Sequence, residues 1–111
     1  MIYNNIDSIE IQNPISIGII GGGQLGKMIA QEAKRMSFRV IILDPTADSP
    51  ASSVSDESII ADFKDENAIT TLANKSDVLT YEIELANSEI LKDLSSKNFI
   101  VHPSPETLGI I

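Results

Sequence analysis

Three glycines, Gly21, Gly23 and Gly26, stand between a run of isoleucines and a stretch of helical periodicity. The run over residues 15–20 is almost continuously apolar, which is typical of a strand covered on both faces. The glycines match the GxGxxG pattern, in which they allow a sharp turn, close approach of a ligand and close helix–strand packing. The chain is therefore expected to open its fold with a strand, a glycine turn and a helix.

The stretch after the glycines predicts an amphipathic helix over residues 25–36. The apolar residues expected to form one stripe along it are Leu25, Met28, Ile29, Ala33 and Met36. Because the glycines stand at the N-terminus of this helix, their backbone N–H groups are expected to be free to bind a phosphate or another anion. A turn that serves packing alone is the alternative interpretation.

Composition narrows the classes of function. The 111 residues suit one domain and are too few for an elaborate two-domain enzyme, and no apolar run is long enough to span a membrane. A formal net charge of −8 argues against nucleic acid as a partner, because such a partner requires a basic surface. Cysteine is absent and His102 is the only histidine, which excludes disulfides, thiolate catalysis and multi-histidine metal sites.

A second apolar run, over residues 38–44, completes a strand–helix–strand unit. Such units form right-handed crossovers in parallel sheets, so both strands are expected to end on the same edge. Asp44 ends the second strand 18 positions beyond Gly26, at about the distance where dinucleotide enzymes have an acid that binds a ribose hydroxyl. The prolines and small polar residues over 45–53 predict a loop. Asp44 is thus a candidate either for binding a sugar or for fixing this turn.

The remaining residues continue the alternation of strands and helices. Apolar runs predict further strands at residues 58–61, 77–81 and 98–101. Helices are expected between them, one capped by Asp65 and ending near Lys75, the other capped by Asn87. The predicted fold class is α/β, a Rossmann-like and mostly parallel sheet of four to five strands with helices on both faces.

Two acids follow the strand predicted at residues 77–81. The alternation of side chains along a strand predicts that Glu82 and Glu84 lie on the same face. Because strand carboxyl ends and glycine turns gather on one edge of such a sheet, a carboxylate here can face the same crevice as the glycines. A solvated pair of acids in a strand-to-helix loop is the alternative. Tyr81 is expected to pack in the core, and His102 to be a structural residue at a strand end.

The chain is expected to start with a loosely attached extension and to be the N-terminal part of a longer protein. Residues 1–14 lack the basic start and long apolar core of a secretory signal. A last helix predicted from Ser104 and Pro105 has barely one turn, and the apolar residues after it would stay uncovered. The expected domains are an extension over residues 1–14 and a Rossmann-like domain over residues 15–111.

Four motifs in this order resemble the N-terminal domain of the N5-carboxyaminoimidazole ribonucleotide synthase family. They lie at residues 17–28, 40–51, 77–84 and 101–106, and the similarity covers roughly residues 15–111. The resemblance implies a pre-ATP-grasp domain, the Rossmann-like opening of an ATP-grasp ligase of purine biosynthesis. The complete enzyme of this family uses Mg-ATP and bicarbonate to form carboxyphosphate and to carboxylate 5-aminoimidazole ribonucleotide.

The resemblance also implies which residues form the site. Gln24 and Glu82 match substrate-contacting positions of the family, and Gly22, Gly23 and Leu25 complete the expected substrate-binding set. A glutamine amide both donates and accepts, and a carboxylate accepts from ribose hydroxyls or an amine. No catalytic residue and no metal ligand is expected in this chain, since the ATP and magnesium sites of the family lie in the following domains. The family's habit implies a cytoplasmic homodimer, and this part alone is expected to be inactive.

Two other functions compete with this interpretation. A Rossmann module that senses NAD or another nucleotide would use Gly21, Gly23, Gly26 and Asp44 equally well. Such a module has no evident need of Gln24, of Glu82 or of residues 103–106. The other competitor is an assembly domain whose glycine turn is purely structural.

Overall fold

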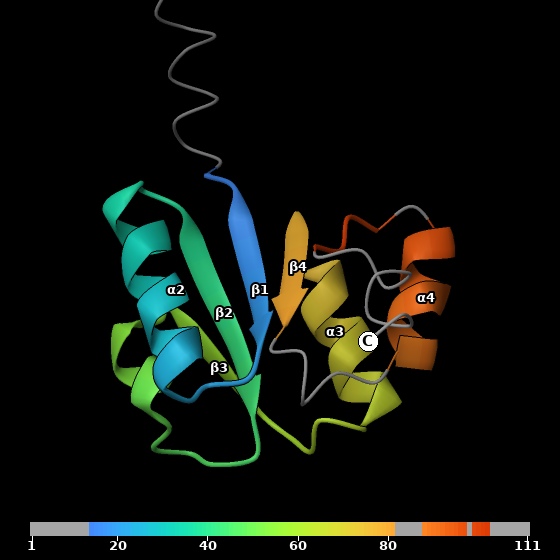
Figure 1. Ribbon diagram of the computed structural model, residues 1–111, viewed down its shortest axis with the longest axis horizontal. Coiled ribbons are helices and arrows are strands. Elements are labelled where there is room, and N and C mark those ends of the chain that lie inside the picture. The colour runs from blue at the N-terminus through green and yellow to red at the C-terminus, as the bar shows by residue number, and fades with distance from the viewer. Residues whose placement is uncertain (1–13, 82–87, 98, 103–111) are drawn as a thin grey trace, which may run out of the picture.

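A computed structural model describes residues 14–81, 88–97 and 99–102. These residues form a four-stranded, all-parallel sheet with the strand order β3-β2-β1-β4 and with helices on both faces (Figure 1). The strands are β1 (Ser16–Ile20), β2 (Arg39–Asp44), β3 (Glu57–Ile60) and β4 (Val78–Tyr81). The helices are α2 (Gln24–Arg35), α3 (Glu66–Asn74), α4 (Ser88–Ser96) and the short 3-10 helix η1 (Pro50–Val54). The predicted α/β class is confirmed.

The sheet separates two apolar layers, with α2 on one side and α3 and α4 on the other (Figure 1). The layer between the sheet, α2 and η1 contains Ile19, Ala30, Ala33, Val40, Ile42 and Ala51. The layer on the α3 and α4 side contains Ile20, Ile41, Leu43, Ile69, Leu72, Leu79, Tyr81, Leu91 and Leu94, among others. Neighbouring residues of β1 and β2 enter opposite layers, as the period-two alternation of a strand requires. This two-sided burial explains the continuous apolar runs of β1 and β2.

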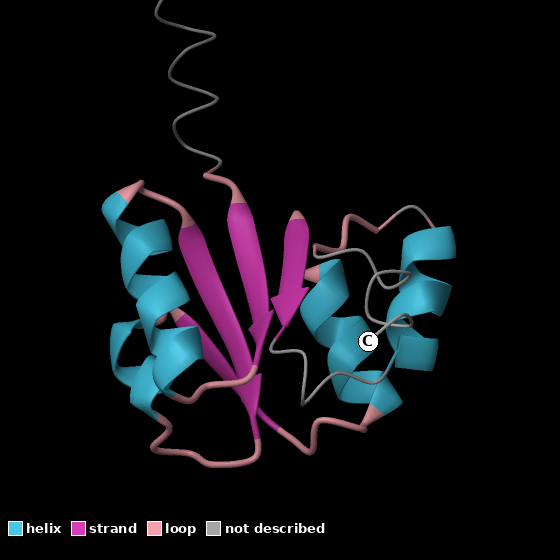
Figure 2. Ribbon diagram, viewed as in Figure 1, coloured by secondary structure: helices cyan, strands magenta, loops and turns pink. Residues whose placement is uncertain are grey.

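Because all four strands are parallel, their carboxyl ends lie at one edge of the sheet (Figure 2). The central strand β1 pairs with β2 and with β4, so that Ile20 is the register partner of both Leu43 and Tyr81. The glycine turn follows Ile20 directly, and the loop with Pro45 follows β2. The edge that carries the candidate site residues is therefore the one predicted from the strand–helix–strand pattern.

Local signals in the sequence account for the element boundaries. Asp65 caps α3, its side chain accepting a hydrogen bond from the Ala68 N–H at 3.0 Å, as predicted. Ser37 adopts a positive φ of 69° in the turn between α2 and β2. On α4, Leu91 and Leu94 are buried.

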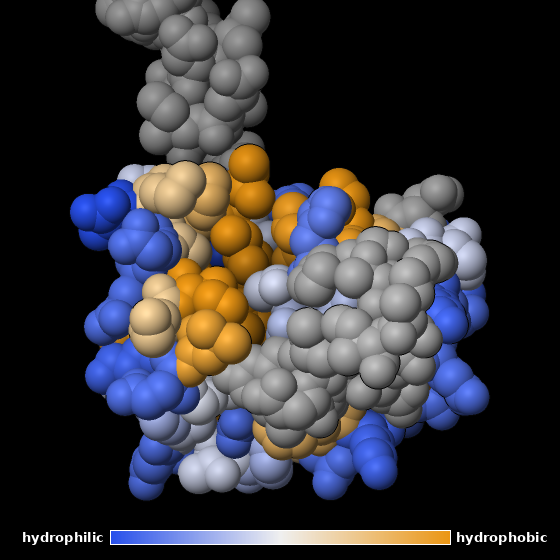
Figure 3. All heavy atoms as spheres, in the orientation of Figure 1, coloured by the Kyte–Doolittle hydropathy of each residue, from blue (hydrophilic) through white to orange (hydrophobic). Residues whose placement is uncertain are grey.

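The orientation of α2 differs from the prediction. Leu25, Met28 and Met36 of the predicted stripe are 50%, 61% and 59% exposed. Ala33 is buried and Ile29 is partly buried. Figure 3 shows hydrophobic residues on the surface of this part of the molecule.

Small residues rather than large ones face the sheet from α2. The buried residues of this helix are Gly26, Ala30 and Ala33. A Cβ added at Gly26 would lie 2.1 Å from the carbonyl oxygen of Gly21, so the helix starts in direct contact with the turn before it. A helix this close to the sheet has no room for leucine or methionine on its inner side, and those side chains therefore remain outside.

Two further expectations are corrected. The stretch predicted as loop over residues 45–53 contains η1, which Ser49 precedes and Pro50 opens. Of the strand predicted at residues 98–101, the described part forms only an isolated parallel bridge between Leu79 and Val101. His102 is exposed beside this bridge, and its N–H donates to the Leu79 carbonyl, in agreement with a structural role at the edge.

Several predictions fall on residues outside the described part. They concern Glu82 and Glu84, the cap by Asn87, the helix from Ser104 and Pro105, and nearly all of the extension over residues 1–14. Among the described helices, none has both the length and the apolar character needed to cross a bilayer.

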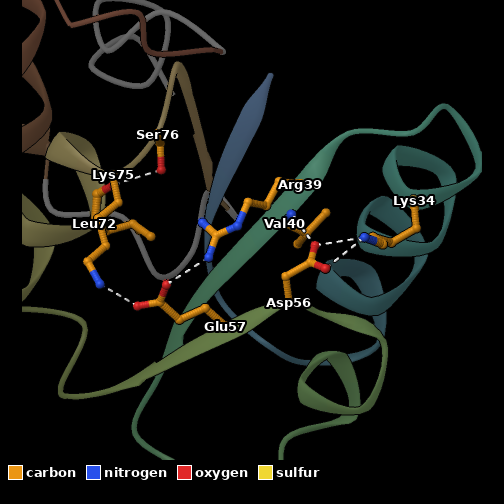
Figure 4. Close-up of polar contacts among 8 residues, drawn as sticks. All are labelled: Lys34, Arg39, Val40, Asp56, Glu57, Leu72, Lys75 and Ser76. Carbon is orange, nitrogen blue, oxygen red and sulfur yellow. Dashed lines mark hydrogen bonds and ion pairs between the residues drawn. The ribbon is translucent and has the colours of Figure 1, made fainter. Parts of the chain in front are cut away.

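Acidic residues hold the edge strand β3 to its neighbours (Figure 4). Asp56 accepts from the Val40 N–H at 2.8 Å and pairs with Lys34. Glu57 pairs with Arg39 at 3.2 Å and also with Lys75. Since Arg39 and Glu57 are the first residues of β2 and β3, these ion pairs lie at the amino ends of the strands, opposite the glycine turn.

Candidate functional site

The glycine turn is built around two positions that require glycine. Gly21 has a φ of 114°, a conformation that side chains rarely adopt, and its N–H donates to the Leu43 carbonyl at 2.9 Å. Gly26 allows the first turn of α2 to contact the Gly21 carbonyl. These two residues therefore serve the tight turn and the helix–strand contact that the motif predicts.

Gly22 is held from both sides by the segment that follows β2. Its N–H donates to Asp44 Oδ2 at 2.8 Å, and its carbonyl accepts from the Ala51 N–H at 2.8 Å. A Cβ added at Gly22 would lie 2.5 Å from Ser49 Oγ. The expectation that all N–H groups of the turn are free is therefore wrong for Gly21 and Gly22, because both donate within the protein.

Asp44 uses both carboxylate oxygens on backbone groups. In addition to the bond from Gly22, its Oδ1 accepts from the Thr46 N–H at 2.8 Å. Asp44 is only 8% exposed. Both hydrogen bonds fix the turn, which is one of the two roles expected for Asp44, and the binding of a sugar hydroxyl by this residue stays a prediction.

The open part of the site is the start of α2. Gly23 is the N-cap residue and receives no side-chain capping bond. Gln24 and Leu25 are exposed, and their N–H groups donate to no backbone carbonyl within the described residues. With the positive end of the helix dipole and Lys27 one turn further, this end of α2 can accept an anionic or carbonyl-bearing group.

The structure brings five of the predicted site residues to one edge and leaves one outside the described part. Gly22, Gly23, Gln24, Leu25 and Asp44 all lie at the carboxyl ends of β1 and β2. Glu82 directly follows Tyr81, the 4% exposed last residue of β4, but belongs to the residues that are not described. Its position beside the turn stays a prediction.

The sequence pattern did not predict the residues of the segment after β2 that contact the glycine turn. Ser49 is 4% exposed, and its Oγ finds no hydrogen-bond partner within the described part of the chain. Ala51 supplies the N–H that binds Gly22. The signal was a serine followed by Pro50, a pair that typically starts a helix and that could have predicted η1.

A pocket of about 320 Å³ lies elsewhere, between the first turns of α3 and α4. It is lined by Lys64, Glu66, Glu89, Ile90 and Asp93. These helices cover the face of the sheet opposite α2, so the pocket is separate from the glycine turn. Within the described ranges, no group of three or more His, Cys, Asp or Glu side chains is arranged to hold a metal ion.

Comparison with known proteins shows what this architecture is similar to. A family model described as the ribonucleotide synthetase preATP-grasp domain matches residues 15–111. The N5-carboxyaminoimidazole ribonucleotide synthase of Staphylococcus haemolyticus is 56% identical over 82 residues, which are 74% of this chain and 22% of that protein. The chain thus spans about a fifth of the length of this curated relative.

Solved structures of similarly named proteins share the fold. The crystal structure of N5-carboxyaminoimidazole ribonucleotide synthetase from Thermotoga maritima has a TM-score of 0.84 and 54% identity, over 87% of this chain and 27% of that one. The Aspergillus clavatus N5-carboxyaminoimidazole synthase, solved with ADP and 5-aminoimidazole ribonucleotide, has a TM-score of 0.78 and 34% identity, over 87% of this chain and 26% of that one.

Proposed function

This chain belongs to the ribonucleotide synthetase preATP-grasp domain family, and we propose that it forms the N-terminal domain of an ATP-dependent carboxylase of purine biosynthesis. The reaction would convert 5-aminoimidazole ribonucleotide and bicarbonate to N5-carboxyaminoimidazole ribonucleotide. The names of the relatives and the ribonucleotide bound in the Aspergillus clavatus structure support this proposal. Residues 15–111 would form the domain and residues 1–14 its N-terminal extension.

One observation carries the proposal: the exposed start of α2 adjoins the carboxyl ends of β1, β2 and β4. The turn offers N–H donors at Gln24 and Leu25, and the Gln24 amide adds a side chain that donates and accepts. Glu82 would add an acceptor for ribose hydroxyls or for the exocyclic amine. Gly22, Gly23 and these three residues are thus proposed to line part of the ribonucleotide pocket.

We assign the binding site of the nucleotide that drives the reaction to parts of the enzyme outside this domain. Relatives of this chain have been solved with ADP and with ATP. Mg-ATP supplies a phosphoryl group that activates bicarbonate, and such chemistry needs acidic metal ligands and a phosphate clamp. We propose that Mg-ATP and bicarbonate bind outside this domain. We also propose that the enzyme is a cytoplasmic homodimer, as the resemblance to the family implies.

The competing function, an NAD-sensing Rossmann module, is less well supported by the contacts at β2. Dinucleotide sites use an acid at this position to bind a ribose hydroxyl. Here Asp44 accepts from the N–H groups of Gly22 and Thr46 and is 8% exposed. In the competing module the ribose hydroxyl would have to reach this buried carboxylate beside those two donors, or bind to another residue.

The proposal is tested with the enzyme that carries this chain as its first domain. Phosphate release from ATP should depend on added 5-aminoimidazole ribonucleotide and bicarbonate. Gln24→Ala should raise the KM for the ribonucleotide about tenfold and leave the KM for ATP unchanged, since one hydrogen-bonding group is lost. Gln31→Ala, on an exposed position of the same helix, is the matched control.

Two results would contradict the proposal. The first is phosphate release that does not respond to the ribonucleotide. The second is tight binding of NADH to this chain in calorimetric titration, which would favour the sensing module.

A further inference from the structure

Asp44 joins two stretches of backbone that are separate in sequence. One oxygen accepts from Gly22 in the turn after β1, and the other accepts from Thr46 in the loop after β2. The bond to Gly22 is buried. Hydrogen bonds from backbone N–H groups to a carboxylate are charge-assisted and stronger than neutral ones. The bond from Gly22 to Asp44 is therefore expected to hold the turn to β2 more strongly than the neutral bond from Gly21 to the Leu43 carbonyl.

Gly22 is also held at its carbonyl, which belongs to the next peptide group, between Gly22 and Gly23. Its carbonyl is bound by the Ala51 N–H of η1 at 2.8 Å. A Cβ at Gly22 would lie 2.5 Å from Ser49 Oγ and 3.1 Å from the Asp44 Cβ, so the turn has no room to shift toward η1. Ser49 Oγ acts here by filling space, because it has no hydrogen-bond partner in the described part of the chain.

We propose that Asp44 is a positioning residue of the ribonucleotide pocket, acting on the ligand only through the Gly22 peptide. This inference rests on the proposed function. By fixing that peptide, Asp44 sets the direction of the N–H groups of the next residues, Gly23, Gln24 and Leu25. A turn that can rotate would spread these donors over several directions and lose the advantage of a preorganised site.

The same contacts have a consequence for specificity. Asp44 is 8% exposed and each of its carboxylate oxygens accepts from a backbone N–H, so the proposal assigns this residue to the turn and not to the ribose of a dinucleotide. The acid at the end of β2 therefore serves the architecture of the turn, and ligand choice passes to the residues at the start of α2. Asp44→Asn keeps the size of the side chain but turns an NH2 group toward one of the two N–H donors.

The test compares Asp44→Asn with Asp48→Asn, an exposed acid in the same loop, in the enzyme that carries this domain. Hydrogen exchange measured by mass spectrometry on the peptide spanning residues 19–25 reports the turn. Steady-state kinetics report the KM for 5-aminoimidazole ribonucleotide and for ATP. We expect Asp44→Asn to speed exchange of the turn about tenfold and to raise the ribonucleotide KM by a similar factor. The KM for ATP and all values for Asp48→Asn should stay within about twofold of wild type.

Other results overturn the proposal. A raised ribonucleotide KM with unchanged exchange would mean that Asp44 contacts the ligand directly. A rise of both KM values together would mean a general loss of structure, and no change in either readout would mean that Asp44 is dispensable. A wild-type enzyme without ribonucleotide-dependent turnover would refute the proposed function instead, and unchanged exchange in Asp44→Asn would refute the positioning role alone.

A second pair of variants tests the same peptide if Asp44→Asn does not fold. Gly22→Ala should push the turn away from Ser49 and raise the ribonucleotide KM, because the new Cβ has no space. Gly22→Ala combined with Ser49→Gly removes both the Oγ and the Cβ of Ser49, and should bring the KM back toward wild type. A double variant no better than Gly22→Ala would show that the clash with Ser49 is not the cause, and an unchanged KM in Gly22→Ala itself would overturn the role of the Gly22 position.

Discussion

Ile20 and Tyr81 are register partners at the carboxyl ends of β1 and β4. Adjacent strands lie about 4.8 Å apart, so the chain leaves the sheet at two neighbouring points. Gly21 begins the glycine turn from one of them, and Glu82 follows the other. This pairing supports the proposal that an acid and the donors of the turn share one pocket.

Glu82→Gln should weaken binding of the ribonucleotide in the enzyme that carries this domain. A hydrogen bond to a charged group contributes about 1.5–3 kcal/mol, so the KM for 5-aminoimidazole ribonucleotide should rise roughly ten- to hundredfold. The KM for ATP should not change. Glu66→Gln, an exposed acid at the start of α3, is the control, and an equal effect in both variants would exclude a specific contact.

The elements predicted correctly are those that local signals determine. The apolar run of β1, the glycine turn and the Asp65 cap of α3 each depend on residues within a few positions of one another. Parallel pairing of β1 with β2 followed from the strand–helix–strand pattern, because a helical crossover joins parallel strands. The common edge of the candidate site was therefore predictable from the sequence.

The contacts that hold the turn were not predictable in this way. Asp44 and Gly22 are 22 positions apart, and the hydrogen bond that joins them depends on how the chain brings the glycine turn to the end of β2. The inner side of α2 was mispredicted for a related reason. Periodicity locates apolar residues on a helix, but the distance between helix and sheet decides whether small or large ones face inward.

Substitutions on the two sides of α2 should show whether small or large residues of this helix pack against the sheet. Met28→Ala should lower the free energy of unfolding by less than about 1 kcal/mol, because the side chain is 61% exposed. Ala30→Leu should lower it by about 1–3 kcal/mol, because Ala30 is fully buried and the layer has no space for three more carbons. Urea denaturation of this chain measures both values. If Met28→Ala lowered the free energy of unfolding more than Ala30→Leu, the large residues of the predicted stripe would be the ones that face the sheet.

Gly26→Ala should be destabilising although alanine favours helices. The added Cβ would lie 2.1 Å from the Gly21 carbonyl oxygen, a backbone atom that cannot rotate away. We expect the free energy of unfolding to fall by about 1–3 kcal/mol, the typical cost of overpacking. Gln31→Ala, an exposed position of the same helix, should leave it nearly unchanged. Equal stability of the two variants in urea would show that α2 can move away from the turn.

The ion pairs of β3 predict how stability responds to acid. The hydrogen bond from Lys75 lowers the pKa of Glu57 below its ordinary value of 4.5, and the Arg39 side chain lowers this pKa further. Partial burial acts in the opposite direction but does not prevail. Since the pKa of Glu57 is lower in the folded than in the unfolded chain, the carboxylate stabilises the fold fully above 4.5. That contribution is lost as the pH falls through the lowered pKa of the folded state.

Lys75→Met should therefore make the free energy of unfolding depend less steeply on pH in the acidic range. Without the ammonium group, the pKa of Glu57 returns toward 4.5 and the folded and unfolded states bind protons more alike. The free energy of unfolding, measured in urea between about pH 7 and about pH 3, should then fall less steeply than in wild type. Lys92→Met removes the same charge from an exposed position of α4 and should keep the wild-type slope. If both variants follow the wild-type profile, the Glu57 ion pairs add nothing measurable to acid sensitivity, as is common for exposed pairs.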